Sequence, residues 1–395
     1  MFAFPQIEKV TRDATIVHFL LMFGYKLFSI YFPLFLVARG FSLPEVGYTY
    51  LLIYLPIALS APFVGFLNHK INPAVLAAVG ILGYAIYALG MILIRNLVLF
   101  YFWQVILGVS AALFFVSARA ILISSPLENY DRAFGWFYTA PFYADAIAPA
   151  VGAFFIWQFN FIGVFILSLF LQLLTAIFCY SRLSGHKVRP LDNFFKFQKL
   201  KYNYQEAFKK IKEKNVLLPS VISFSALLLS GFYFGFFVLS LKDILHFSQN
   251  QILIFISVFS LIFLPISIFL IERLGRLRSE ENIFRGALVD GIFSVIFGAF
   301  LPVLNFFYLL LINTGRAASN LICNSGRSGL LSQKLKENPE EAGALDTVFS
   351  PLGVALGALV SGMIIGFLGY QLLFIIGGIF VITTAVLANL LKQKK

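Results

Sequence analysis

Three charged residues lie at the centres of long apolar segments. Lys26, Asp145 and Arg316 are each the thirteenth residue of such a segment, so all three fall at mid-depth if the segments cross a membrane. A charge at the bilayer centre costs about 2.5–3.5 kcal/mol on insertion scales, and it is tolerated where it faces a wet cavity or an opposite charge. Two cations and one acid could bind an anionic or zwitterionic solute, with the Asp145 carboxylate carrying a proton or cation. A simpler interpretation is also open, in which Lys26 and Asp145 form an ion pair that only joins two helices.

A polar stripe accompanies Arg316 along its own segment. The stripe runs from Asn313 to Arg327 with spacings of 3, 4, 4 and 3, which is one face of a helix. A polar stripe on a membrane helix must face protein or water, so this face predicts the wall of a cavity. Tyrosine hydroxyls and one glutamine amide on other segments could add hydrogen bonds. The predicted solute-binding residues are Lys26, Tyr25, Tyr54, Gln104, Asn313, Arg316 and Asn320.

Other charges in the apolar segments indicate coupling or gating. Asp290 is a second candidate for proton coupling, although Arg285 on the same segment makes a structural or gating pair the better interpretation. Arg119, Arg327 and Asp346 lie near the ends of their segments. We interpret these three residues as charges of an inner gate or of an interface between helices.

The composition requires membrane helices to position these residues. Of 395 residues, 60% are hydrophobic and only 12% are charged, and the mean hydropathy is +0.88. Soluble domains carry about 25% charged residues, so a soluble enzyme and a nucleic-acid-binding protein are both excluded. We predict an all-α polytopic membrane protein with twelve transmembrane helices in two pseudo-symmetric six-helix halves. The predicted spans are 14–38, 45–67, 73–94, 97–119, 133–157, 160–181, 216–241, 251–271, 284–303, 304–326, 343–367 and 370–391.

One long polar connection divides the chain. Residues 182–215 separate a first half, 1–181, from a second half, 216–395. The two halves resemble each other at an offset of 208 residues, which indicates duplication. The connection predicts a basic amphipathic helix on the inner leaflet, and a solubilising linker is the alternative. The apolar face of that helix is Phe197, Leu200, Tyr204, Phe208 and Ile211.

The distribution of lysine and arginine predicts the orientation. With the N-terminus inside, 24 of the 30 basic side chains fall on inner segments and only Arg39, Arg95 and Lys242 on outer loops. Basic residues collect on the cytoplasmic side of membrane proteins. We therefore expect both termini and the connection 182–215 to be cytoplasmic, in a multi-pass protein of the plasma or inner membrane.

The sequence offers little for chemistry other than transport. Its two cysteines and four histidines lack the spacing of metal ligands, so we expect no metal and no cofactor. There is no phosphate-binding glycine-rich motif for an ATP-driven motor. The predicted outer loops are short and carry no pair of carboxylates, which disfavours a lipid-modifying membrane enzyme. A lipid flippase stays an open alternative.

Several segments resemble the major facilitator superfamily. YFPLFLVARGFSLPEVGYTY (31–50) is similar to the end of its helix 1, outer turn and start of helix 2. GFLNHKINP (65–73) is a degraded first copy of its inner-loop signature, and RAFG (132–135) is similar to the turn before its helix 5. FSPLGVALGALVSGMIIGFLGY (349–370) resembles helix 11, where glycines four residues apart predict close helix packing. The second inner-loop copy, IERLGRLR, supplies the candidate gating residues Glu272, Arg273, Gly275 and Arg276.

The resemblance implies a secondary active transporter in which two halves rock around a central cavity lined by helices 1, 4, 7 and 10. Gln104 stands where many proton-coupled members have arginine, and ADAIAPAVGA (144–153) keeps only part of the antiporter motif. We expect a monomer that carries a small organic solute with a proton or another coupling ion among membrane lipids, and drug-exporter-like export is favoured. An uptake symporter or exchanger for an anionic or zwitterionic metabolite is the alternative.

Overall fold

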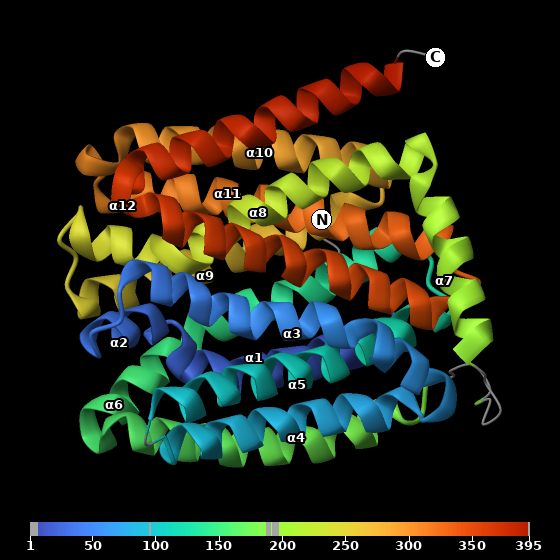
Figure 1. Cartoon of the computed structure of the whole chain (residues 1–395), viewed down its shortest axis with the longest axis horizontal. Coiled ribbons are helices and arrows are strands. Elements are labelled where there is room, and N and C mark those ends of the chain that lie inside the picture. The colour runs from blue at the N-terminus through green and yellow to red at the C-terminus, as the bar shows by residue number, and fades with distance from the viewer. Residues whose placement is uncertain (1–6, 95, 187–190, 192–196, 394–395) are drawn as a thin grey trace.

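The computed structural model describes residues 7–94, 96–186, 191 and 197–393, and this part of the chain is almost entirely helical. Figure 1 shows long helices packed side by side, with α1–α6 gathered on one side and α8–α12 on the other. Arg95, part of the predicted linker and the side chain of Phe197 lie outside the described residues. The helices are α1 (Lys9–Ser29), α2 (Phe32–Ala38), α3 (Leu43–Lys70), α4 (Pro73–Ile92), α5 (Leu97–Ser124), α6 (Tyr130–Leu183), α7 (Phe197–Lys212), α8 (Lys214–Asp243), α9 (Gln249–Leu274), α10 (Ser279–Phe300), the 3₁₀ turn η1 (Leu301–Val303), α11 (Phe306–Lys334) and α12 (Pro339–Gln393).

Nine helices in the described ranges are long and apolar enough to cross a membrane. Two of them are too long for one crossing, since α6 has 54 residues and α12 has 55, whereas about 20 residues suffice to span a bilayer. Each contains a break with positive φ, at Asn160 (54°) and at Gly369 (69°). The breaks fall where the sequence predicts one span to end and the next to begin. Glycine adopts this left-handed conformation at low cost, which explains the residue type at 369.

The helix with the polar stripe is the exception to the apolar pattern. α11 has 29 residues, but it is not among the nine apolar helices because asparagine and arginine side chains follow its length. α1 and α2 together make one candidate span, interrupted next to Pro33, which lacks the backbone N–H that a continuous helix needs. The all-helical polytopic fold is therefore confirmed. The count of twelve crossings and the residue limits of the two halves stay predictions.

The predicted linker helix is present as α7 and lies across one end of the bundle (Figure 1). We call this the α7 end. Leu200, Ala207 and Ile211 are buried against the protein, whereas Phe208 is 49% exposed. The apolar face of α7 thus packs against the helix bundle itself. This corrects the predicted face, since Leu200 and Ile211 turn toward the protein and not toward the inner leaflet. Contact of the exposed Phe208 with lipid stays a prediction.

Close packing of α12 against α8 depends on a glycine of the predicted packing motif. A Cβ at Gly357 would lie 2.0 Å from the carbonyl oxygen of Leu228, so only glycine fits without moving backbone. A Cβ at Gly366, on the same helix, would meet nothing within 4 Å. Close packing therefore requires glycine at 357 but not at 366.

Candidate functional site

A cavity of about 290 Å³ lies between the two groups of helices. Its wall comes from α1, α2, α3, α6, α8, α9 and α11. Most of the lining residues lie in the half of the bundle farthest from α7. The volume is close to the lower limit, about 300 Å³, of typical small-molecule pockets. Lys26, Asp145 and Arg316 all line it, so the three mid-depth charges of the sequence do meet at one site.

Lys26 and Asp145 form an ion pair in the wall of this cavity. The Lys26 Nζ donates to Asp145 Oδ2 at 3.1 Å, and the pair joins α1 to α6. Both side chains keep some access to the cavity, with exposed fractions of 19% and 15%. The other carboxylate oxygen, Asp145 Oδ1, is buried and has no hydrogen-bond partner among the described residues. The pair can therefore join two helices and also offer a free oxygen for a proton.

Arg316 has a different acid partner, which does not line the cavity. Arg316 Nε lies 3.2 Å from Asp290 Oδ1, and the Asp290 side chain is fully buried behind it on α10. The guanidinium carbon sits 2.9 Å from the ring centroid of Tyr233, whose hydroxyl donates to Ser294 Oγ at 3.1 Å. Arg316 is thus held from two sides, by a carboxylate and by an aromatic face.

This partner corrects the predicted pairing of Asp290 with Arg285. Arg285 instead reaches Glu281, one helical turn away on the exposed side of α10. Residues four apart on a helix share a face, whereas 285 and 290 do not. Spacing within one helix could not reveal Arg316, because the pair crosses between two helices.

Aromatic rings make up much of the remaining wall. Asn313 and Asn320 line the cavity beside Arg316, as the stripe on α11 predicts. The site therefore combines a charged and amide-bearing region with an apolar aromatic surface, which suits a solute with both kinds of group. The aromatic lining residues are Tyr25, Tyr50, Tyr54, Phe142, Tyr233, Phe234, Phe237, Phe255 and Phe259.

Gln104 is not part of the cavity, so its prediction as a solute ligand is wrong. Its side chain is buried, with Nε2 donating to the Phe100 carbonyl oxygen at 3.2 Å and Oε1 accepting from the Tyr87 hydroxyl at 3.3 Å. α5 turns this face toward α4. The amide is thereby satisfied inside the first group of helices and has no role left for a solute.

The cavity is closed toward the α7 end by a buried network around Asp346. Arg327 Nε donates to Asp346 Oδ1 at 2.9 Å, and Arg119 Nε lies 3.2 Å from Oδ2. Ser328 Oγ donates to Oδ2 at 2.6 Å, and the Tyr138 hydroxyl bonds to Ser328 Oγ at 2.7 Å. Because α5 and α6 belong to one side and α11 and α12 to the other, this network joins the two groups of helices. The three predicted gate charges therefore meet at one point.

The polar stripe of α11 connects the cavity to that network. Asn320 lines the cavity, and its Oδ1 accepts from Asn324 Nδ2. Asn324 Oδ1 in turn accepts from Arg327 Nη1 at 2.6 Å. A continuous chain of hydrogen bonds thus runs from the cavity wall to Asp346.

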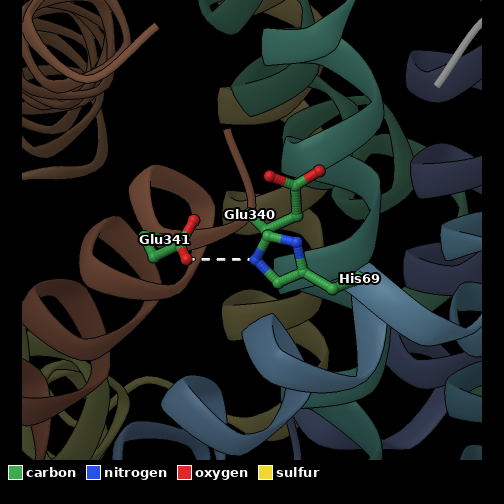
Figure 2. A group of neighbouring side chains, drawn as sticks. All are labelled: His69, Glu340 and Glu341. Carbon is green, nitrogen blue, oxygen red and sulfur yellow. Dashed lines mark hydrogen bonds and ion pairs between the residues drawn. The ribbon is translucent and has the colours of Figure 1, made fainter. Parts of the chain in front are cut away.

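Two further contacts between the helix groups flank the Asp346 network. We call the contact of α3 with α12 the first seam and the contact of α6 with α10 the second seam. At the first seam, His69 Nε2 lies 3.0 Å from Glu341 Oε1. Figure 2 shows these two side chains facing each other. At the second seam, the Asp131 carboxylate on α6 accepts from Ser279 Oγ at 2.8 Å and Asn282 Nδ2 at 2.9 Å, both on α10. The sequence analysis missed these contacts. The one available signal was the degraded first inner-loop copy, in which either His69 or Asn68 stands at the position of the acid.

The second inner-loop motif does not supply the gate contacts predicted for it. Glu272, Arg273 and Arg276 are exposed, with Arg273 lying over the ring of Phe269, and Gly275 lies beside Asn129 and Arg132. The hydrogen bonds of the second seam come from the polar residues that follow the motif, Ser279 and Asn282. Of the four predicted gating residues, only Gly275 faces α6, whereas Glu272 and Arg273 point outward from the last turn of α9.

One group of side chains has the composition of a metal site. His69, Glu340 and Glu341 each offer one ligand atom within 4.8 Å of the others. Figure 2 shows the His69 ring bonded to Glu341, with the Glu340 carboxylate to one side. His69 and Glu341 are already hydrogen-bonded to each other, and this bond joins α3 to α12 without a metal. The expectation of no metal stays a prediction.

Comparison with known proteins identifies the family. The profile of the Major Facilitator Superfamily matches residues 14–326, and the chain therefore belongs to this superfamily of membrane transporters. No curated protein sequence matches significantly. The crystal structure of the human organic anion transporter MFSD10 (TETRAN) is similar in fold, with a TM-score of 0.76 over 97% of this chain and 100% of that chain, at 15% sequence identity. The protein is a multi-pass membrane transporter, and the expectation that it is not an enzyme is confirmed.

Proposed function

We propose that this protein transports an amphipathic organic anion together with a proton, by alternating access between two six-helix halves. The observation that carries the proposal is the ion pair of Lys26 and Asp145 in the cavity wall. Each cation of the cavity has an acid partner, so an anionic solute finds no free positive charge while both acids are ionised.

Protonation of Asp145 would release Lys26 for the solute. An anion bound at Lys26 would in turn favour the protonated form of Asp145, because the Lys26 ammonium would then pair with the solute and no longer with the Asp145 carboxylate. Such coupling between two ligands is reciprocal. Proton and anion thus bind together, which favours uptake by symport over the drug-exporter-like exchange expected from the sequence.

Asp290 has a separate role in this proposal. It is sealed behind Arg316 and does not line the cavity, so it is poorly placed to exchange protons with the solute pathway. Its charge, with the Tyr233 ring, would hold the Arg316 guanidinium in one direction as a second contact for the anion.

The aromatic wall supports an amphipathic solute. Phenylalanine and tyrosine rings surround the charged region, and such surfaces favour apolar or aromatic bodies. The structurally similar human protein is an organic anion transporter by its description, which agrees with this class of solute.

The state described is closed at the α7 end, and the orientation predicted from lysine and arginine makes that end cytoplasmic. The cavity would then be accessible from outside. The chain from Asn320 to Arg327 would let an occupied cavity influence the Asp346 closure.

The test uses purified protein in liposomes and two dyes with the same ring system, the anion fluorescein and the cation rhodamine 123. We expect acid outside to drive accumulation of fluorescein and not of rhodamine 123. Accumulation driven by acid inside would indicate exchange of the solute for protons. Accumulation that does not depend on the pH gradient would show that transport is not coupled to protons.

Variants of the two acids separate their roles. Asp145→Asn should abolish gradient-driven accumulation and keep exchange of labelled for unlabelled fluorescein, because a neutral amide resembles the protonated acid. Asp290→Asn should raise the KM for fluorescein about tenfold and leave the dependence on the pH gradient intact, because it disturbs only the position of Arg316. Glu128→Gln removes an exposed acid outside the cavity and serves as the control.

A further inference from the structure

Three elements meet around Gly65 at the first seam. A Cβ on Gly65 of α3 would lie 3.0 Å from the Ala344 Cβ of α12, 3.0 Å from the Tyr204 hydroxyl of α7 and 3.2 Å from the Glu340 carbonyl oxygen. α3 and α12 belong to opposite groups of helices. α7 is therefore packed against the line along which the two groups touch.

α7 also hydrogen-bonds to both sides of that line. Asn203 Nδ2 donates to Glu341 Oε1 at 2.7 Å, the same oxygen that faces His69 in Figure 2. The next residue, Tyr204, donates its hydroxyl to the Pro62 carbonyl oxygen of α3 at 3.4 Å. Two adjacent residues of one helix thus bind α12 and α3.

These two contacts are partly buried. Burial, with the Glu341 carboxylate as a smaller contribution, raises the pKa of the Tyr204 hydroxyl well above its usual range, so it stays a donor. Leu200, Ala207 and Ile211 bury the apolar face of α7 beside the seam. The ion pair of Lys210 with Glu337 at 3.4 Å is more exposed and adds little.

We propose that α7 is a strap that holds the first seam shut and must release α3 or α12 before the cavity can open toward the α7 end. The second seam is closed by contacts of α6 with α10, through Asp131, Ser279 and Asn282. The connection between the halves would therefore act as part of the gate as well as a tether. This inference does not depend on which solute the protein carries or on proton coupling.

The test measures the distance across the seam without any solute. Spin labels are placed at Ile71, after α3, and at Lys336, before α12, in protein whose two buried cysteines are replaced by alanine (Cys179→Ala, Cys323→Ala). Both label positions are exposed. The labelled protein in lipid nanodiscs should show one short distance, that of the closed seam.

Asn203→Asp is the principal variant, because it replaces a donor to Glu341 with a like charge. Since a hydrogen bond to a charged group is lost and repulsion replaces it, the population with a longer distance should rise by about tenfold. Tyr204→Phe keeps the ring and removes only the bond to Pro62, so it should fold normally and give a smaller increase. Gln205→Glu makes the same charge change on the exposed side of α7 and should leave the distances unchanged.

Asp346→Asn shows that opening can be detected, because it weakens the central network without touching α7. If Asp346→Asn lengthens the distance and neither Asn203→Asp nor Tyr204→Phe does, α7 is not a strap. Equal opening by Gln205→Glu would also overturn the proposal, since the effect would then come from charge on α7 and not from its contacts.

Discussion

At the residue scale, each cation of the cavity is matched with an acid on another helix. Lys26 of α1 pairs with Asp145 of α6, and Arg316 of α11 pairs with Asp290 of α10. The pairs differ in access, because both members of the first line the cavity and only Arg316 of the second does. This asymmetry gives the two acids different expected roles in transport, although both are aspartates paired with a cation of the cavity.

The Lys26–Asp145 pair also predicts a stability effect. Lys26→Gln should lower the melting temperature by several degrees, because leaving the Asp145 carboxylate without its partner costs about 1–3 kcal/mol. The combined variant with Asp145→Asn should recover most of that loss, since two neutral side chains no longer leave a charge unpaired. Thermal unfolding of the purified proteins measures both, with Lys242→Gln as an exposed control. A Lys26→Gln protein as stable as the parent would mean that the pair adds nothing to stability.

At the element scale, the packing of α12 against α8 depends on a close approach of the two helix backbones. Gly357→Ala should destabilise the protein by about 1–3 kcal/mol or more, because the added methyl overlaps the Leu228 carbonyl between α12 and α8. Gly366→Ala adds the same methyl group in open space on the same helix and should be nearly neutral. The yield of folded protein and its melting temperature check both. Equal effects of the two variants would show that helix propensity, and not packing, decides.

At the scale of the whole molecule, the closure lies at the end that α7 crosses, and the side of the membrane follows from charge. Reporter fusions at Lys70 and Lys199 should report inside, and a fusion at Lys242 should report outside. The reason is the concentration of basic residues in the segments at the α7 end. An outside signal at Lys199 would change the number of crossings before it and would contradict the arrangement of two six-helix halves.

The sequence by itself determined the fold class and the approximate ends of most helices, and it predicted the depth of the key charges. The physical reason is that span length and the cost of a charge in lipid are local properties. The breaks near Asn160 and Gly369, the stripe on α11 and the mid-depth positions of Lys26, Asp145 and Arg316 all follow from them.

Only the tertiary structure decided which faces of the helices meet. An apolar helix in a membrane protein gives little periodic signal about its rotation, because lipid and neighbouring helices are equally apolar. Gln104 could therefore be placed within a span but not on its true face, toward α4. The sequence shows that the Asp290 charge lies in an apolar span, where an unpaired charge is costly, but its partner Arg316 lies on another helix. The contact of His69 with Glu341, and the attachment of α7 to it, join residues far apart in the chain, and no local pattern encodes them.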